Sequence, residues 1–132
     1  MSTFSKATPA PSKIHLHQKS QQLELVYADA QFFLPAEYLR VFSPSAEVQG
    51  HGPGQQVLQQ GKIHVKIKSI EGQGNYAIKI VFDDGHDSGI YTWNYLYELG
   101  QFQAKNWQDY EQQLAAAGKS RDPHESPVRL IS

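Results

Sequence analysis

The sequence predicts an α+β fold of one domain, in which antiparallel β-hairpins carry short helices packed on the sheet. Apolar and polar residues alternate with a period of two in several short segments, which indicates half-buried strands. These segments come as hairpin-linked neighbours with helices interspersed, which favours antiparallel pairing. The 132 residues provide material for about one domain, at roughly 150 residues each.

The first third of the chain predicts a hairpin, a further extended segment and a short helix. Apolar and polar side chains alternate on both sides of a polar turn at residues 18–21. Pro35 suits the first position of a helix because its φ is already close to the helical value. The expected ranges are 14–17 and 22–27 for the strands, 31–34 for the extended segment and 36–41 for the helix.

The middle of the chain predicts a long loop followed by a second hairpin. Residues 45–61 are rich in glycine and glutamine, a composition typical of irregular loops, and loops of this length are often functional. Basic residues then alternate with isoleucine and valine over residues 62–68. After a turn at residues 71–74, the apolar residues at alternate positions of 76–82 predict the return strand.

The last third of the chain predicts two helices. The first covers residues 93–99 and begins after Thr92, whose hydroxyl can cap it. Gly100 is expected to end this helix in the left-handed conformation. A second helix over residues 106–117 is expected to pack an aromatic stripe on the body. The stripe consists of Trp107, Tyr110 and Leu114.

The predicted organisation is a single folded domain between two tails. Both ends of the chain contain proline together with small polar or charged residues, a composition typical of disordered tails. The expected segments are a disordered N-terminal tail at residues 1–12, the folded domain at 13–103, a C-terminal amphipathic helix at 104–118 and a disordered C-terminal tail at 119–132.

The composition excludes several classes of function. The chain contains no cysteine, which excludes disulfides, thiolate zinc sites, iron-sulfur ligation and cysteine nucleophiles. A formal net charge of -1 provides no field for steering toward nucleic acid or an anionic membrane. No stretch reaches about 18 consecutive apolar residues, and the N-terminus lacks the apolar segment of a secretory signal. We therefore expect a soluble cytoplasmic protein with no nucleic-acid or membrane partner.

The motifs of common enzymes are missing from the sequence. Ser88 lacks the flanking pattern of a Gly-x-Ser-x-Gly turn. The glycine-rich segment at residues 50–54 lacks the Lys-Ser/Thr ending of a phosphate-binding loop. With no complete catalytic constellation, the sequence predicts that this protein is not an enzyme.

Histidines and carboxylates are the remaining candidate metal ligands. His15 and His17 would lie on the same strand face about 7 Å apart, a geometry that holds an ion only if a third ligand comes from elsewhere. A polar solvent face is the simpler interpretation of this pair. His86 lies beside Asp84 and Asp87 in a turn dense in oxygen donors, and such turns usually satisfy their own backbone groups.

A lysine-rich face of the second hairpin is the one cluster of like charge. Lys62, Lys66 and Lys68 would share a side of the outgoing strand, with Lys79 across the hairpin. These lysines could bind a phosphate or an acidic partner. They could equally protect the edge of a sheet from aggregation, which is the simpler interpretation.

Three segments of the sequence resemble the gamma-butyrobetaine hydroxylase-like N-terminal domain family. They are residues 39–47, residues 70–77 and residues 82–96, and the last contains the run Gly-His-Asp-Ser-Gly-Ile-Tyr-Thr-Trp. The resemblance covers roughly residues 13–100. It implies a small α+β module that precedes an iron- and 2-oxoglutarate-dependent catalytic domain in hydroxylases. In other proteins the module accompanies P-loop iron-sulfur carrier ATPases or stands alone, and this chain resembles a stand-alone bacterial-type member.

The resemblance also implies the position of a structural zinc site. In the hydroxylases a C-x-C-x-x-C cluster and a later histidine hold the ion. The corresponding positions here are Ser43, Ser45, Val48 and His86. Hydroxyl and isopropyl groups bind zinc poorly, so we expect this zinc site to be lost and predict no cofactor. A weak site of His51 and His86 with Asp84 or Asp87 is the remaining alternative.

Three functional hypotheses follow. The favoured hypothesis is a non-catalytic accessory or protein-interaction module that presents residues 43–60 and the His86 turn to a protein of unknown identity. The other residues expected to contact that partner are Asp84, Asp87, Tyr91 and Trp93. The first alternative is a metal-binding module linked to iron or iron-sulfur handling through His86 and His51. The weaker alternative is binding of an anionic ligand by the lysine face.

Overall fold

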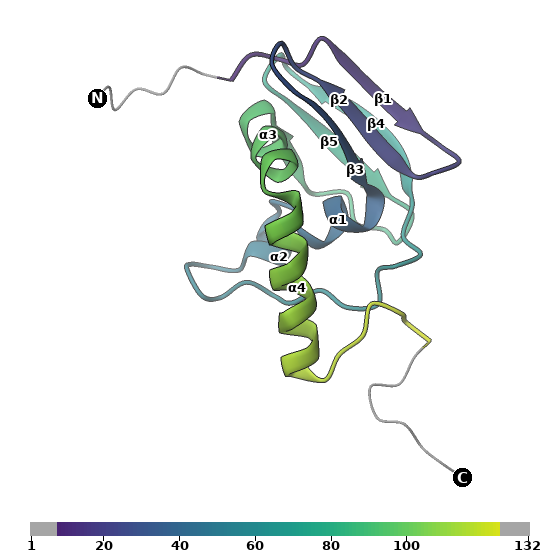
Figure 1. The fold of residues 1–132 in the computed structure, drawn as a ribbon, viewed down its shortest axis with the longest axis vertical. Helices are drawn as coiled ribbons and strands as arrows, with labels where there is room; N and C mark the ends of the chain where they lie inside the picture. Colours follow the sequence, from purple (N-terminus) through teal and green to yellow (C-terminus); the bar gives the residue numbers. More distant parts are fainter. Residues whose placement is uncertain (1–7, 125–132) are drawn as a thin grey trace.

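The computed structural model describes residues 8–124, and these residues form two three-stranded antiparallel sheets and four helices (Figure 1). In chain order the elements are β1 Lys13–His17, β2 Gln22–Val26, β3 Gln31–Pro35, α1 Ala36–Val41, α2 Ala46–Gln49, β4 Ile67–Gln73, β5 Ala77–Phe82, β6 Ile90–Thr92, α3 Trp93–Gln101 and α4 Gln103–Ala117. This architecture confirms the predicted α+β class. No helix in the described part of the chain is long and apolar enough to cross a membrane.

The first sheet has the strand order β1-β2-β3. Ile14 lies opposite Leu25 in the first pair, and Leu23 lies opposite Leu34 in the second. The three leucines are fully buried, so this face of the sheet covers the core. The intervening residues, including His15, point to the opposite face because side chains alternate along a strand. The predicted first hairpin and third strand are therefore confirmed.

The second sheet has the strand order β4-β5-β6. β4 begins only at Ile67, so the prediction of a strand from residue 62 is wrong over residues 62–66. The backbone N–H of Ile63 donates instead to the carbonyl of Arg121 over 3.1 Å. The alternation does not describe this segment, because Ile63 is 38% exposed and its hydrogen-bond partner lies far away in the sequence. The return strand is confirmed as β5.

Two helices begin where the sequence predicts. α1 covers Ala36–Val41, and α3 begins at Trp93. The Thr92 hydroxyl accepts a hydrogen bond from the backbone N–H of Tyr95 over 3.1 Å, which satisfies one of the free amides of the first turn. α2, at Ala46–Gln49, lies in the segment for which the sequence predicts an irregular loop.

Gly100 has a packing role rather than the predicted capping role. α3 continues through it to Gln101, so the helix does not end there. A Cβ atom on Gly100 would lie 2.3 Å from Cγ of Phe32. Glycine is therefore required at this position because α3 packs directly on the aromatic ring of β3.

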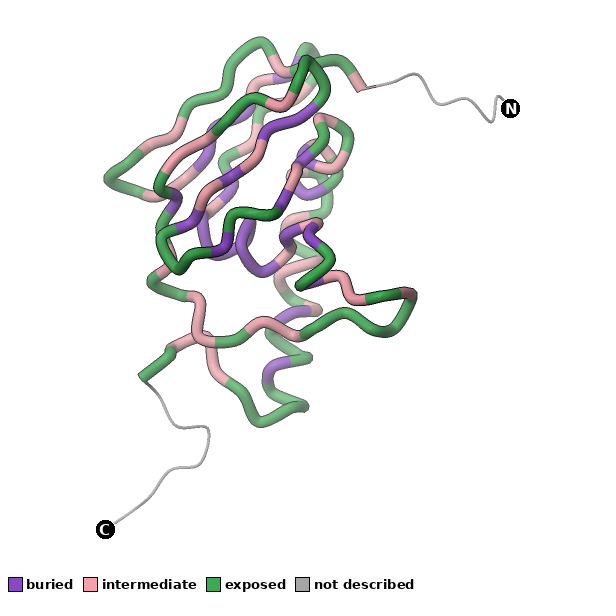
Figure 2. The backbone as a smooth tube through the Cα atoms, turned by 180° about the vertical axis from the view of Figure 1, so that it is seen from behind, coloured by how far each residue is buried: buried purple, intermediate pink, exposed green. Residues whose placement is uncertain are grey.

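The two sheets share one main hydrophobic core with α1 and α3, and the buried residues of α4 form a smaller cluster with Val41. Figure 2 shows where the buried stretches lie along the backbone. Buried tyrosines tie this core together through hydroxyls that donate to backbone carbonyls. Tyr38 donates to Leu99 over 2.6 Å, and Tyr91 donates to Leu39 over 2.5 Å. Three further tyrosines make the same kind of bond: Tyr27 donates to the carbonyl of Trp93, Tyr95 to that of Phe42, and Tyr110 to that of Gln59. Each bond satisfies a polar group whose burial would otherwise be costly.

The predicted aromatic stripe of the last helix is confirmed in α4. Tyr110 and Leu114 are buried. The ring centroids of Trp107 and Tyr38 lie 6.1 Å apart, and those of Tyr110 and Phe42 lie 6.2 Å apart. The helix therefore packs on α1 and on the residue that follows it.

Parts of the two predicted tails contact the body. The backbone N–H of Ser12 donates to Val26 over 2.7 Å. The Arg121 guanidinium donates two hydrogen bonds to the carboxylate of Glu37, over 2.8 and 2.7 Å. Arg121 is thus held against α1, whereas the sequence assigns it to a disordered tail. Residues 1–7 and 125–132 of the two predicted tails lie outside the described residues.

Candidate functional site

The turn between β5 and β6 places His86 against the segment that joins α1 to α2. The backbone N–H of Phe82 donates to the carbonyl of His86 over 2.9 Å and closes this turn. His86 is only 6% exposed. Its Nε2 atom lies 2.8 Å from Ser43 Oγ and 3.3 Å from Ser45 Oγ. The structure therefore joins three of the four positions that the resemblance implies for zinc, and we call Ser43, Ser45 and His86 the His86 site.

Ser43 is fixed in the His86 site by contacts on several sides. Its side chain is fully buried, and its Oγ accepts a hydrogen bond from the backbone N–H of Ser45. The side-chain amide of Gln49 donates to its carbonyl over 3.0 Å. A Cβ atom on Gly89 would lie 2.6 Å from Ser43 Oγ, so only glycine lets the turn approach this closely.

Positive charge surrounds the carboxylate next to the His86 site. Asp84 accepts hydrogen bonds from Arg40 Nε over 2.9 Å and from Lys62 Nζ over 3.0 Å. Its other oxygen accepts the backbone N–H of His86 over 3.2 Å. Burial alone would raise the pKa of Asp84, but the bonds from Lys62, the His86 backbone and Arg40 outweigh burial and lower it.

The His86 imidazole is held neutral by its surroundings. Burial, and then the positive charge of Arg40, lower the pKa of His86 below its ordinary value. Glu47 opposes this shift, with its Oε2 atom 3.5 Å from His86 Nδ1. That carboxylate is 70% exposed, so solvent screens it and the lowered pKa prevails.

The residues of the His86 site do not fit the structural zinc that the resemblance implies. Two hydroxyls replace thiolates, and the third thiolate position is Val48 on α2. Structural zinc requires four thiolate or imidazole ligands, and His86 alone supplies one. Its Nε2 is already bonded to serine, and Arg40 and Lys62 would repel a dication. The chemistry of the site is therefore that of a closed hydrogen-bond cluster.

The structure disperses the other residues predicted to act with His86. His51 and Asp87 are exposed, and no group of three metal ligands among residues 8–124 contains either of them. Tyr91 is fully buried, so its predicted place on a partner surface is wrong. Trp93 is half-buried and donates its indole N–H to the carbonyl of Asn75 over 2.8 Å.

The predicted lysine face is also dispersed. Lys62 pairs with Asp84, and Lys79 lies 3.3 Å from Glu71. Lys66 and Lys68 remain exposed. Residue 68 falls at a register irregularity of β4, so the four ammonium groups do not line a single strand face.

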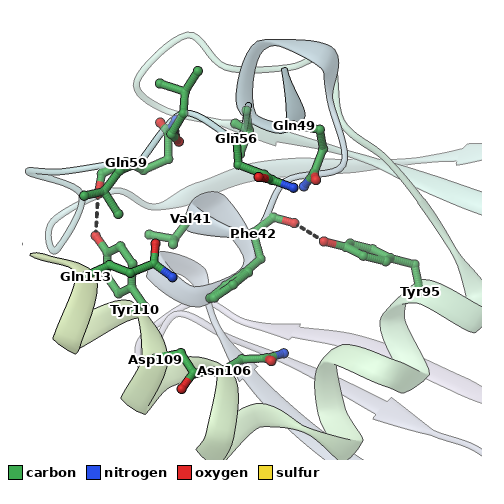
Figure 3. A pocket seen from close by; sticks show the side chains of 13 residues that line it. Val41, Phe42, Gln49, Gln56, Gln59, Tyr95, Asn106, Asp109, Tyr110 and Gln113 are labelled. Carbon is green, nitrogen blue, oxygen red and sulfur yellow. Dashed lines mark hydrogen bonds between the residues drawn. The ribbon is translucent and has the colours of Figure 1, made fainter. Parts of the chain in front are cut away.

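A groove between α4 and the long loop is one cavity that the sequence did not identify (Figure 3). Its volume is about 340 Å³. Its lining consists of Val41, Phe42, Val48, Gln49, Gln56, Val57, Leu58, Gln59, Tyr95, Asn106, Asp109, Tyr110 and Gln113. Aliphatic and aromatic side chains thus meet five side-chain amides, and the lining contains one carboxylate and no cationic side chain.

Two tyrosines hold the walls of this groove in place. Tyr110 donates to the carbonyl of Gln59 and ties α4 to the long loop, while Tyr95 donates to the carbonyl of Phe42. Burial raises the pKa of both hydroxyls to about 12, so they remain protonated donors. The glutamine-rich loop and the amphipathic last helix were visible in the sequence, but only the fold brings them together.

The fold and the site define a small α+β domain with a closed His86 site and an open amide-lined groove. A comparison with protein families matches residues 14–97 to the family described as gamma-butyrobetaine hydroxylase-like, N-terminal. The chain belongs to this family, as the sequence resemblance predicts. A comparison with curated proteins found no match.

Solved structures extend the likeness to most of the chain. An NMR solution structure of one protein is 54% identical, with a TM-score of 0.81 over 95% of this chain and 99% of that one. A second NMR structure is 45% identical, with a TM-score of 0.78 over 98% of both chains. A crystal structure from Acidithiobacillus ferrooxidans ATCC 23270 is 34% identical, with a TM-score of 0.60 over 73% of this chain and 98% of that one. That protein has unknown function and belongs to the DUF971 family.

Proposed function

We propose that this protein is a non-catalytic accessory module that binds an uncharged, extended segment of a partner protein in the groove beside α4. The observation that carries the proposal is the lining of this groove. Five side-chain amides surround an apolar floor, and Asp109 is its one carboxylate. Gln49, Gln59 and Asn106 already donate to Ser43, Val57 and Tyr38. The amides of Gln56 and Gln113 have no hydrogen-bond partner within residues 8–124, and because amides both donate and accept they match the alternating N–H and C=O groups of a polypeptide backbone.

The groove also offers apolar contacts for side chains of such a segment. Val57 is 52% exposed on the long loop, and Phe42 and Leu58 are partly buried beside it. Interfaces place apolar anchors at the centre and polar groups around them. A segment with small apolar side chains and no charge would match both parts of the lining.

One arrangement within residues 8–124 resembles a catalytic triad, and it is closed. Ser43 Oγ lies 2.8 Å from His86 Nε2, and Glu47 lies 3.5 Å from the other ring nitrogen. A nucleophilic serine must reach its substrate, yet Ser43 is fully buried and is not among the residues that line the groove. We therefore propose a structural role for this trio.

The groove proposal is tested by placing a photo-crosslinking amino acid at Val57 in the full chain, expressed in the native cell. The matched control is Tyr76, which is 57% exposed in the turn after β4. We expect the chain with the crosslinking residue in place of Val57 to capture one protein, and the chain with it in place of Tyr76 not to capture that protein. With that protein purified, Val57→Asp should weaken binding at least about tenfold, a loss of about 1.4 kcal/mol, and Tyr76→Asp should leave it unchanged. Equal capture from both positions, or equal binding by both variants, would refute the proposal.

A further inference from the structure

The outer face of the first sheet carries a cluster of two histidines and a glutamate, far along the chain from the groove. His15 in β1 lies directly opposite Glu24 in β2. His17 lies two residues beyond His15 and shares its face, because side chains alternate along a strand. One hairpin therefore brings all three side chains together, and we call His15, His17 and Glu24 the hairpin site.

The ligand atoms of the hairpin site are close enough to share an ion. One atom from each side chain lies within 4.8 Å of the other two, and no other group of three metal ligands in residues 8–124 meets this condition. His17 Nε2 and Glu24 Oε1 are 2.9 Å apart. Two ligands at about 2.1 Å from a tetrahedral zinc ion lie about 3.4 Å apart. The rings of His15 and His17 stack with centroids 4.2 Å apart and an interplanar angle of 19°, so their lone pairs converge on one ion only after the exposed His15 ring turns out of the stack and the His17–Glu24 pair opens slightly.

Neighbouring residues hold the carboxylate in position. Glu24 is 5% exposed, and the side-chain amide of Gln31 donates to its Oε2 over 2.7 Å. This bond leaves Oε1 directed at His17 and orients the carboxylate, as residues behind metal ligands commonly do. The turn of the hairpin is also anchored, because the Gln21 side chain accepts the backbone N–H of Ile67 over 2.8 Å.

We propose that His15, His17 and Glu24 bind a divalent transition-metal ion, for which Zn²⁺ is the best match. Two imidazoles and one carboxylate form a donor set that zinc accepts in proteins, with water in the fourth position. Magnesium and calcium prefer oxygen ligands alone. The hairpin site lies on β1 and β2, whereas the positions of the family's zinc-binding cysteines lie within α2 and just before it.

Lys13 competes with the metal for the same oxygen. Its ammonium group lies 3.4 Å from Glu24 Oε1, and its side chain is 52% exposed. An ammonium ion and Zn²⁺ cannot both occupy this position because their charges repel. Lys13 must turn into solvent when the ion binds, so its removal should tighten binding.

The test is a zinc titration of the full chain without an affinity tag, followed by calorimetry. We expect one equivalent of Zn²⁺ to bind. His15→Gln and His17→Gln should each weaken binding at least about tenfold, and Lys13→Ala should strengthen it. His51→Gln is the matched control because His51 is also an exposed histidine. Amide spectra of each variant confirm that the fold is retained.

Nuclear magnetic resonance of the imidazole nitrogens locates the ion independently. Zinc should shift the ring nitrogens of His15 and His17 and leave those of His51 and His86 unchanged. Absence of binding at millimolar zinc would overturn the proposal. An equal loss of affinity in His51→Gln, or shifts centred on another histidine, would overturn it as well.

Discussion

The His86 site and the hairpin site both place imidazole nitrogens beside oxygen atoms, but their surroundings are opposite. At the His86 site the oxygens belong to neutral hydroxyls, the ring is buried, and its pKa is lowered. At the hairpin site the oxygen belongs to a carboxylate, and the two rings lie at the surface. Ligand charge and access, rather than the presence of histidine, therefore separate a structural cluster from a candidate metal site.

The nearby cations reinforce this difference. Arg40 is buried and fixed on Asp84 beside the His86 site, so it cannot leave when a dication approaches. Lys13 beside the hairpin site is exposed and free to turn away. Repulsion between like charges grows as water is excluded. The repulsion between a bound dication and the neighbouring positive side chain is therefore stronger at the His86 site than at the hairpin site.

The largest effect is expected from restoring thiolates at the His86 site. The triple variant Ser43→Cys, Ser45→Cys and Val48→Cys supplies the three ligands that join His86 in the family pattern. Structural zinc sites of this kind have apparent binding free energies of about 10 kcal/mol or more. We expect the variant to bind one equivalent of zinc far more tightly than the hairpin site does, as measured by competition with a chromophoric chelator.

The control for this experiment replaces the same three residues with alanine. It creates similar changes in packing without adding a ligand, so it should bind no more zinc than the unaltered chain. If the cysteine variant also gains no affinity, these three positions do not correspond to the zinc ligands of the family. Ligand charge would then explain less of the difference in zinc binding between the His86 site and the hairpin site.

A second prediction concerns the stability that each site contributes. Ser43→Ala removes the nearest hydrogen-bond partner of a buried imidazole, which should cost about 1–3 kcal/mol of unfolding free energy. Ser88→Ala is a suitable control because Ser88 is an exposed serine of the adjacent turn whose hydroxyl donates to the exposed carboxylate of Glu47. Urea unfolding measures both values, and equal losses would show that the His86 site is not a structural cluster.

A third prediction uses the pH dependence of the His86 site. The folded protein binds a proton at His86 less readily than the unfolded chain, whose histidine pKa is 6.5. The contribution of His86 to stability is therefore complete above this pH, and it is lost as the pH falls from there through the lowered folded pKa. Urea unfolding at a series of pH values should show this loss. His86→Gln should remove that part of the slope, and an unchanged slope would argue against a neutral, buried ring.

The smallest effect is expected at the hairpin site without metal. His17→Gln removes a contact between a partly exposed ring and the buried carboxylate of Glu24. This carboxylate keeps its contacts with Gln31 and Lys13, and glutamine can also donate to it, so we expect a loss of less than about 1 kcal/mol. The free energy of unfolding in the presence of a chelator should therefore change by less than it does in Ser43→Ala. A loss as large as that of Ser43→Ala would assign the hairpin site a structural role too.

Local patterns determined much of the fold. Alternating side chains predicted the first hairpin and β5, Pro35 and Thr92 marked the starts of α1 and α3, and the aromatic stripe predicted the buried face of α4. These features depend on residues a few positions apart, because strands repeat every two residues and helices about every 3.6. The family motif likewise located Ser43 and His86 as partners.

The tertiary structure decided the features whose partners are distant in the chain. Residues 62–66 do not form the predicted strand, because the backbone of Ile63 bonds to Arg121. Residue 100 must be glycine because a Cβ atom there would collide with Phe32. The groove likewise requires α4 to lie beside the long loop. Even within one hairpin, the strand register was needed to place Glu24 opposite His15. Periodicity specifies which face of an element is buried, whereas three-dimensional packing specifies what that face meets.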